Sequence, residues 1–140
     1  MPTPVLDAAG VNALLRKAFP DAAPVGFPTV TEVSPGRVKV VAAYREGLLR
    51  PGGVISGPVL MSLADTAAYA LVLAHIGDQL MAVTSSLHMN FLRGARPGDL
   101  HAEAQMLRLG RRNAVCDVRL WTEGPERLAA QAVVTYAIPQ

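Results

Sequence analysis

One carboxylate interrupts a long apolar run in this sequence. The stretch from Arg50 to Leu71 reads RPGGVISGPVLMSLADTAAYAL, and Asp65 is its one acidic residue. A carboxylate among apolar residues is costly to bury, so it needs a partner or a chemical role. The chemistry that it offers is that of a general base, which takes a proton from water, or of a nucleophile.

Glycines ahead of Asp65 offer a second reactive group. Gly57 precedes Pro58, and proline is favoured at the first helical position because no acceptor is available there for an N–H. A backbone N–H at the amino end of a helix is unpaired and lies at the positive end of the helix dipole. The N–H of Gly57 is therefore a candidate donor to an oxygen that gains negative charge.

The spacing of these two groups limits how they act. Asp65 follows Gly57 by eight residues, which is roughly 12 Å along a helix that rises about 1.5 Å per residue. Both groups cannot act on one carbonyl within one chain. If both are used, the site combines Gly57 of one subunit with Asp65 of the partner subunit, and this predicts a twofold dimer.

Asp65 also has a purely structural interpretation. We expect its carboxylate to be buried, because its neighbours about one helical turn away are apolar or aromatic. These neighbours are Met61, Ala64, Ala68 and Tyr69. In this interpretation the carboxylate hydrogen-bonds a buried backbone group or Thr66 and takes no part in a reaction.

Arginines supply candidate anion contacts. The stretch RLGRR contains Arg108, Arg111 and Arg112, whose guanidinium groups can bind phosphate oxygens in bidentate fashion. The alternative for these three is a solvated hairpin turn. Arg50 has three interpretations: it binds substrate, pairs with an acid, or flanks the glycine loop.

Composition narrows the classes of function. The chain has 140 residues, 51% of them hydrophobic, which suits one domain with its own core. The net charge of +2 is too small to indicate a nucleic-acid or membrane partner. A lone cysteine, Cys116, cannot form an internal disulfide, and without a signal-like amino terminus a cytoplasmic location is expected. The histidines His75, His88 and His101 are too widely spaced for a metal-ligand pair, so no metal site or other cofactor is expected.

Helical patterns occur twice. Asp7 can cap a first helix in which apolar residues recur at helical spacing from Val11 to Phe19. The segment over residues 58–74 is apolar nearly all round but is too short and too polar for a membrane span. It indicates a buried central helix, with His75 placed at the negative end of its dipole.

The remaining segments are typical of strands. FPTVTEV and RVKVVAAY, joined by Ser34-Pro35-Gly36, predict a β-hairpin ahead of the central helix. In MAVTSSLHMNFL polar and apolar residues alternate, so Thr84, Ser86 and His88 share a polar face. DLHAEAQMLRL, NAVCDVRLW and RLAAQAVVTYAI follow with short connections. This order predicts an α+β fold in which an antiparallel sheet wraps around one long central helix, with an extra helix at the amino-terminal end.

Three stretches, in this order, resemble the hot-dog fold, and specifically the PaaI-like acyl-CoA thioesterases. They are GGVISGPVLMSLADTAAYA, HMNFLRGARPGDLHAEAQML, and RLGRRNAVCDVRLW with LAAQAVVTYAI. The resemblance covers residues 25–138. It implies one hot-dog domain over residues 1–140, with residues 1–24 as a helical extension. It also implies a homodimer with shared active sites, assembled as a dimer of dimers.

Matched positions imply roles for individual residues. Asp65 matches the family's helix carboxylate, which acts as general base or nucleophile, and Gly57 matches the glycine whose N–H polarises the thioester carbonyl. Ser86 matches a strand hydroxyl that in some members helps to place the attacking water, although a contact with solvent or another subunit is the alternative. Ser56 stands where the family has a histidine, and Arg50 stands where relatives often have an asparagine. We keep Ser56 and Arg50 as candidate substrate-binding residues.

The first functional hypothesis is an acyl-CoA thioesterase, which hydrolyses a thioester to a free acid and coenzyme A. Asp65 and Gly57 act across a dimer interface, and Arg108, Arg111 and Arg112 contact the phosphates of coenzyme A. The alternative is a non-catalytic hot-dog protein that binds acyl-CoA or a small ligand after loss of the usual histidine and asparagine. A hydratase is a weaker third hypothesis, because the histidine expected of that chemistry is missing.

Overall fold

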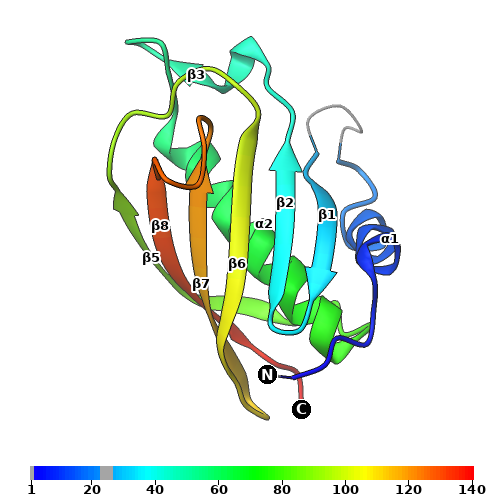
Figure 1. Cartoon of the computed structure of the whole chain (residues 1–140). Helices are drawn as coiled ribbons and strands as arrows, with labels where there is room; N and C mark the ends of the chain where they lie inside the picture. Colours follow the sequence, from blue (N-terminus) through cyan, green and yellow to red (C-terminus); the bar gives the residue numbers. More distant parts are fainter. Residues whose placement is uncertain (1, 23–26) are drawn as a thin grey trace.

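A curved antiparallel sheet wraps around one long helix, α2 (Figure 1). The structure is a computed structural model that describes residues 2–22 and 27–140. Its elements in chain order are α1 (Ala8–Ala18), β1 (Thr29–Ser34), β2 (Arg37–Ala42), the 3-10 helix η1 (Glu46–Leu48), β3 (Leu49–Arg50), β4 (Val54–Ile55), α2 (Gly57–Ile76), β5 (Val83–Phe91), β6 (Leu100–Leu109), β7 (Asn113–Trp121) and β8 (Ala130–Ala137). This arrangement confirms the predicted α+β fold class.

Six strands form the main sheet in the order β1-β2-β6-β7-β8-β5, and every neighbouring pair is antiparallel. Strands β1 and β5 are therefore the two edges of the sheet. Along β6, β7 and β8 most buried residues alternate with more exposed ones, as expected when one face of a sheet covers a core. The short antiparallel pair β3–β4 leads into α2, and two-residue strands leave no periodic pattern by which a sequence indicates them.

Helix α2 is the centre of the core. It is slightly longer than the predicted segment over residues 58–74, and every residue from Ala67 to His75 is buried. By length and composition α2 is apolar enough to cross a membrane, but 67% of its most apolar stretch is buried inside this fold. Burial beneath the sheet thus accounts for its apolar character.

Helix α1 begins as predicted, because Asp7 caps it by accepting a hydrogen bond from the N–H of Gly10 at 2.8 Å. Its buried residues Val11 and Leu15 join the main core, and its last turn is tied to the segment after α2 by an ion pair of 2.8 Å between Lys17 and Asp78. Residues 1, 23 and 24 of the expected helical extension lie outside the described residues. The extension over residues 1–24 and the domain bounds stay a prediction.

The β1–β2 turn is fastened to α2 through His75. The buried N–H of Gly36 donates to His75 Nε2 at 3.0 Å, and the Nδ1 atom lies 2.9 Å from the carbonyl oxygen of Leu71. Because a backbone N–H can only donate, Nε2 is the acceptor and Nδ1 carries the proton. His75 therefore links two elements of the fold, a role that its position at the helix end did not indicate.

Candidate active site

Two hydroxyl groups bind the Asp65 carboxylate. Thr84 on β5 donates to Asp65 Oδ1 at 2.6 Å, and Tyr136 on β8 donates to the same oxygen at 2.7 Å. The Tyr136 hydroxyl also lies 3.2 Å from the Asp65 carbonyl oxygen. Among the described residues, no hydrogen bond falls on Oδ2. The carboxylate is thus fixed through one oxygen and keeps the other for a further partner.

Burial around Asp65 is less complete than the sequence indicated. The Asp65 side chain is half-buried, and Met61, expected to cover it, is 42% exposed. The partner expected in the structural interpretation, Thr66, makes no hydrogen bond to the carboxylate among the described contacts. The partners are instead hydroxyls from two strands, which the helical neighbourhood could not reveal.

A β-bulge at Ser85 decides which hydroxyl on β5 meets Asp65. Thr84 pairs with Tyr136 and Ser86 pairs with Thr135, so Ser85 is the extra residue between the two pairs. Opposed residues of a ladder share a face, and along β8 Tyr136 is buried whereas Thr135 is not. Thr84 therefore turns toward α2 and Ser86 toward the outer face. Within one chain the β5 hydroxyl beside Asp65 is that of Thr84, and the role of Ser86 in placing the attacking water stays a prediction.

Tyr136 is well suited to remain a hydrogen-bond donor. Burial is the largest cause that raises the pKa of its phenol. The neighbouring Thr84 hydroxyl lowers that pKa, while the hydrogen bond and negative charge of Asp65 raise it. The net effect places the pKa of Tyr136 far above its usual range, so the proton stays on the phenol.

The Asp65 carboxylate lines a cleft of about 430 Å³. Its walls come from the end of α1, from α2, from the segment before β5, from the start of β5, and from β8. Apolar and aromatic side chains form most of them: Phe19, Tyr69, Leu80, Met81 and Val83. Lys17 is the one basic residue of this lining among the described residues, and it is paired with Asp78.

Gly57 lines a different cleft of about 410 Å³ at the amino end of α2. As the first helical residue, Gly57 has no intrahelical acceptor for its N–H, as predicted. Arg50 from β3, Phe91 from the end of β5, and Arg93 also line this cleft. The structure thus brings Arg50 to Gly57, and it adds Arg93, which the sequence analysis missed.

Ser56 does not reach either cleft. It precedes α2 in an extended conformation, its side chain makes no capping hydrogen bond, and its backbone N–H donates to Leu48 at 3.0 Å. Its assignment as a substrate contact stays a prediction. Asp65 and Gly57 lie in separate clefts, as their spacing along the helix predicts.

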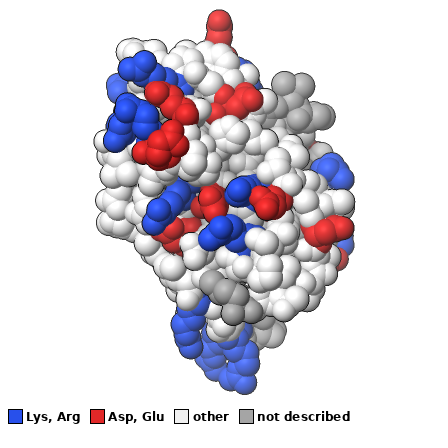
Figure 2. All heavy atoms as spheres, in the orientation of Figure 1, with Lys and Arg blue, Asp and Glu red and all other residues white. Residues whose placement is uncertain are grey.

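The three arginines of RLGRR lie on the exposed β6–β7 hairpin. In Figure 2 basic side chains gather at the lower end of the molecule, where this hairpin projects in Figure 1. None of Arg108, Arg111 and Arg112 is in an ion pair within the described part of the chain. Tyr136 is the cross-strand partner of Ala114 on β7 and of Thr84 on β5. Ala114 adjoins the hairpin, and Thr84 and Tyr136 bind Asp65, so the hairpin lies at the Asp65 end of the sheet.

No metal site is formed by the described residues, since no three His, Cys, Asp or Glu side chains gather there. The Asp65 cleft holds a carboxylate bound by a hydroxyl and a phenol. Its chemistry is a carboxylate with one free oxygen beside an apolar hollow, which suits proton transfer or attack at a carbonyl group.

Comparisons with known proteins identify the family of this chain. The model of the thioesterase superfamily matches residues 52–129, a range that contains α2 and β5. A relative from Deinococcus radiodurans, named "Putative esterase", is 36% identical over 115 residues, which are 78% of this chain and 76% of that protein.

Solved structures extend the likeness to the whole fold. A "putative thioesterase" from Silicibacter sp. TM1040 has a TM-score of 0.87 and 38% identity, covering 98% of this chain and 94% of its own. A variant of the phenylacetic acid degradation protein PaaI from Thermus thermophilus has a TM-score of 0.71 and 28% identity, covering 82% and 95%. The chain therefore belongs to the thioesterase superfamily, as a PaaI-like thioester hydrolase with the hot-dog fold.

Proposed function

We propose that this chain hydrolyses acyl-CoA thioesters at a site shared by two subunits. Asp65 is the general base or nucleophile, and the N–H of Gly57 is the oxyanion donor. The observation that carries the proposal is the hydrogen bonding of the Asp65 carboxylate. Oδ1 accepts both hydroxyl hydrogen bonds, so Oδ2 is the oxygen available to water or substrate.

The reaction follows from these two groups. As general base, Asp65 Oδ2 takes a proton from water while the water oxygen bonds to the thioester carbon. The carbonyl oxygen gains negative charge and is stabilised by the Gly57 N–H. The carbon–sulfur bond then breaks, and the thiolate of coenzyme A takes up the proton from Asp65. As nucleophile, Oδ2 itself bonds to the carbon, expels the thiolate, and gives an anhydride that water hydrolyses.

The two clefts lie at opposite ends of one edge strand, and this supports a shared site. Thr84, near the start of β5, lines the Asp65 cleft, and Phe91, at the end of β5, lines the Gly57 cleft. Phe91 follows Thr84 by seven positions, which span about 23 Å at roughly 3.3 Å per residue. If β5 of two copies pair antiparallel about a twofold axis, the start of one strand lies opposite the end of the other. Each Asp65 cleft then faces a Gly57 cleft of the other copy.

The surface beside β5 supports such pairing. β5 is a sheet edge, so the free hydrogen-bonding side of its backbone is open to a further strand. Of the eight large apolar side chains exposed in the described part of the chain, five lie on β5, beside it or on the neighbouring face of α2: Met61, Met81, Val83, Phe91 and Leu92. Exposed apolar groups concentrated in this way are typical of a subunit interface.

Arginines near both ends of the proposed site fit a substrate with phosphate groups. Arg50 and Arg93 line the Gly57 cleft, and the hairpin arginines Arg111 and Arg112 lie at the Asp65 end of the sheet. Guanidinium groups bind phosphate oxygens in bidentate fashion. We assign the hairpin arginines, with Arg108, to the phosphates of coenzyme A.

A thiol-release assay over short, long and aromatic acyl-CoA substrates tests the proposal. The variant Asp65→Asn should lose about 10²- to 10⁴-fold in kcat, the usual contribution of a general base, while its melting temperature and dimer mass stay near those of the wild type. Asp21→Asn is the matched control, because Asp21 is exposed and lines neither cleft.

An unchanged rate in Asp65→Asn would remove Asp65 from the mechanism. Thermal stabilisation by acyl-CoA without thiol release from any substrate would instead support a binding protein.

A further inference from the structure

Aromatic side chains form a line that starts at Asp65. The chain has three Phe, three Tyr and one Trp, and two Phe and two Tyr stand in this line. Tyr136, which binds Asp65, stacks on Tyr69 with ring centroids 5.6 Å apart. Tyr69 meets the edge of Phe19 at 6.0 Å, and Phe19 lies 5.9 Å from Phe27. The line therefore leads from the carboxylate to the end of α1.

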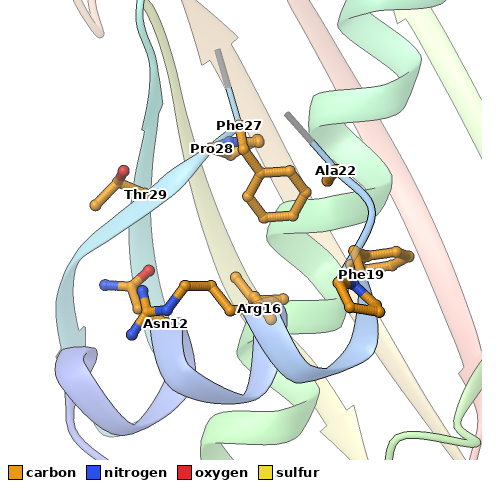
Figure 3. A pocket seen from close by; sticks show the side chains of 9 residues that line it. Asn12, Arg16, Phe19, Ala22, Phe27, Pro28 and Thr29 are labelled. Carbon is orange, nitrogen blue, oxygen red and sulfur yellow. The ribbon is translucent and has the colours of Figure 1, made fainter. Parts of the chain in front are cut away.

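Phe19 separates two hollows. Among the described residues, it is the one that lines both the Asp65 cleft and a second hollow, of about 400 Å³, between α1 and the start of β1. Figure 3 shows Phe19 and Phe27 among the side chains around this second hollow. The Phe19 side chain is 45% exposed, so open space adjoins its ring. Removing that ring would join the two hollows.

The lining of the Asp65 cleft suits hydrocarbon better than phosphate. Its described walls are mostly apolar or aromatic, and the one cation among them, Lys17, is already paired with Asp78 at 2.8 Å. Coenzyme A carries several negative charges, for which the arginines outside this cleft are better partners. A thioester held at Asp65 is therefore oriented with its acyl group toward Tyr69 and Phe19.

We propose that Phe19 is the end wall of the acyl subsite and sets the longest acyl chain that the enzyme accepts. The inference rests on the proposed function in one respect: the thioester carbon must lie at Asp65. A chain that runs from Asp65 along Tyr69 meets the Phe19 ring, and beyond that ring lies the apolar part of the second hollow, formed by Leu15, Pro20 and Phe27. A smaller side chain at position 19 opens this space to longer chains.

The test compares Phe19→Ala with the wild type over straight-chain acyl-CoA substrates of increasing length. The wild-type kcat/KM should stop rising at a certain acyl length. Beyond that length, each further methylene should raise the kcat/KM of Phe19→Ala by up to about fourfold, which corresponds to the burial of one methylene group. Phe27→Ala is the matched control, since Phe27 lines the second hollow and touches Phe19 but does not line the Asp65 cleft. Its length profile should stay that of the wild type. Melting temperatures of both variants separate loss of stability from changed selectivity.

Binding gives a readout that does not depend on turnover. S-alkyl-CoA thioethers of the same lengths cannot be hydrolysed, and their thermal stabilisation of each variant reports the length limit directly. A longer limit in Phe19→Ala alone supports the end wall, even if no acyl-CoA is hydrolysed and the proposed function fails. An unchanged limit in Phe19→Ala, or an equal shift in Phe27→Ala, would overturn the inference while leaving hydrolysis at Asp65 intact.

Discussion

Removal of a single hydroxyl, in Tyr136→Phe, tests how Asp65 is held. The ring can keep its packing on Tyr69, whereas the hydrogen bond of 2.7 Å to Oδ1 is lost. Because the pKa of Tyr136 is raised by burial, the phenol donates this bond throughout the neutral and mildly alkaline range. The loss of activity should therefore be the same across that range.

The size of the effect follows from the bond that is removed. A hydrogen bond to a charged group contributes about 1.5–3 kcal/mol, and roughly 1.36 kcal/mol corresponds to a tenfold change in rate. If the bond holds Oδ2 in its reactive position, kcat should fall roughly 10- to 100-fold. The lower part of this range is expected because Thr84 still donates to Oδ1 at 2.6 Å. KM should change little, since Oδ1 is already occupied by its two hydroxyl donors and Oδ2 is the oxygen left for the reaction.

Thiol release under saturating acyl-CoA measures kcat for Tyr136→Phe, Thr84→Val and Thr84→Ser. The serine variant keeps the hydroxyl and should retain most of the activity, whereas the valine variant should resemble Tyr136→Phe. In the double variant Thr84→Val with Tyr136→Phe the combined loss should differ from the product of the single losses, because both donors act on one oxygen. A wild-type kcat in Tyr136→Phe, with the fold intact, would refute the positioning role.

Two further predictions concern the core. Burial raises the pKa of the Cys116 thiol to about 12, so a thiol reagent should react slowly with the native protein and rapidly in urea. Because the thiol ionises near its usual pKa of 9 only in the unfolded chain, the free energy of unfolding should also fall as the pH rises above that value. Rapid labelling without denaturant would contradict the burial on which both predictions rest. His75→Leu leaves the buried N–H of Gly36 without its acceptor and should lower the free energy of unfolding by about 1–3 kcal/mol in urea melts, whereas the exposed His88→Leu should stay within about 0.5 kcal/mol.

The fold was largely predictable because strong periodic patterns determine it. A helix as apolar as residues 58–74 is stable mainly at the centre of a core. The alternating segments after Gly77 bury their apolar residues when they form a sheet with one face on that core. The helix cap at Asp7 is local chemistry and followed from the sequence. The β3–β4 pair is too short to leave a pattern.

The candidate site was predictable only where it depends on one element. The helical spacing of Gly57 and Asp65 correctly placed them in separate clefts. Thr84 as the β5 partner of Asp65 was not foreseen, because a bulge at Ser85 shifts the alternation of the strand and leaves no mark in the sequence. Tyr136 lies in a largely apolar strand pattern, AVVTYAI, where an aromatic residue suggests core packing alone.

The central claim is that Asp65 and Gly57 act on one thioester from two different chains, and mixed dimers test it most directly. One chain carries Asp65→Asn and the other Gly57→Pro, which removes the N–H assigned as the oxyanion donor. Proline suits this place, since Ser56 before it is extended and a Cβ at position 57 makes an ordinary contact of 3.5 Å with the Phe91 ring. Purified with two different tags, the mixed dimer contains one intact site in the shared arrangement and should show roughly half of the wild-type rate, while each parent variant is nearly inactive. A mixed dimer as inactive as its parents would contradict the shared site.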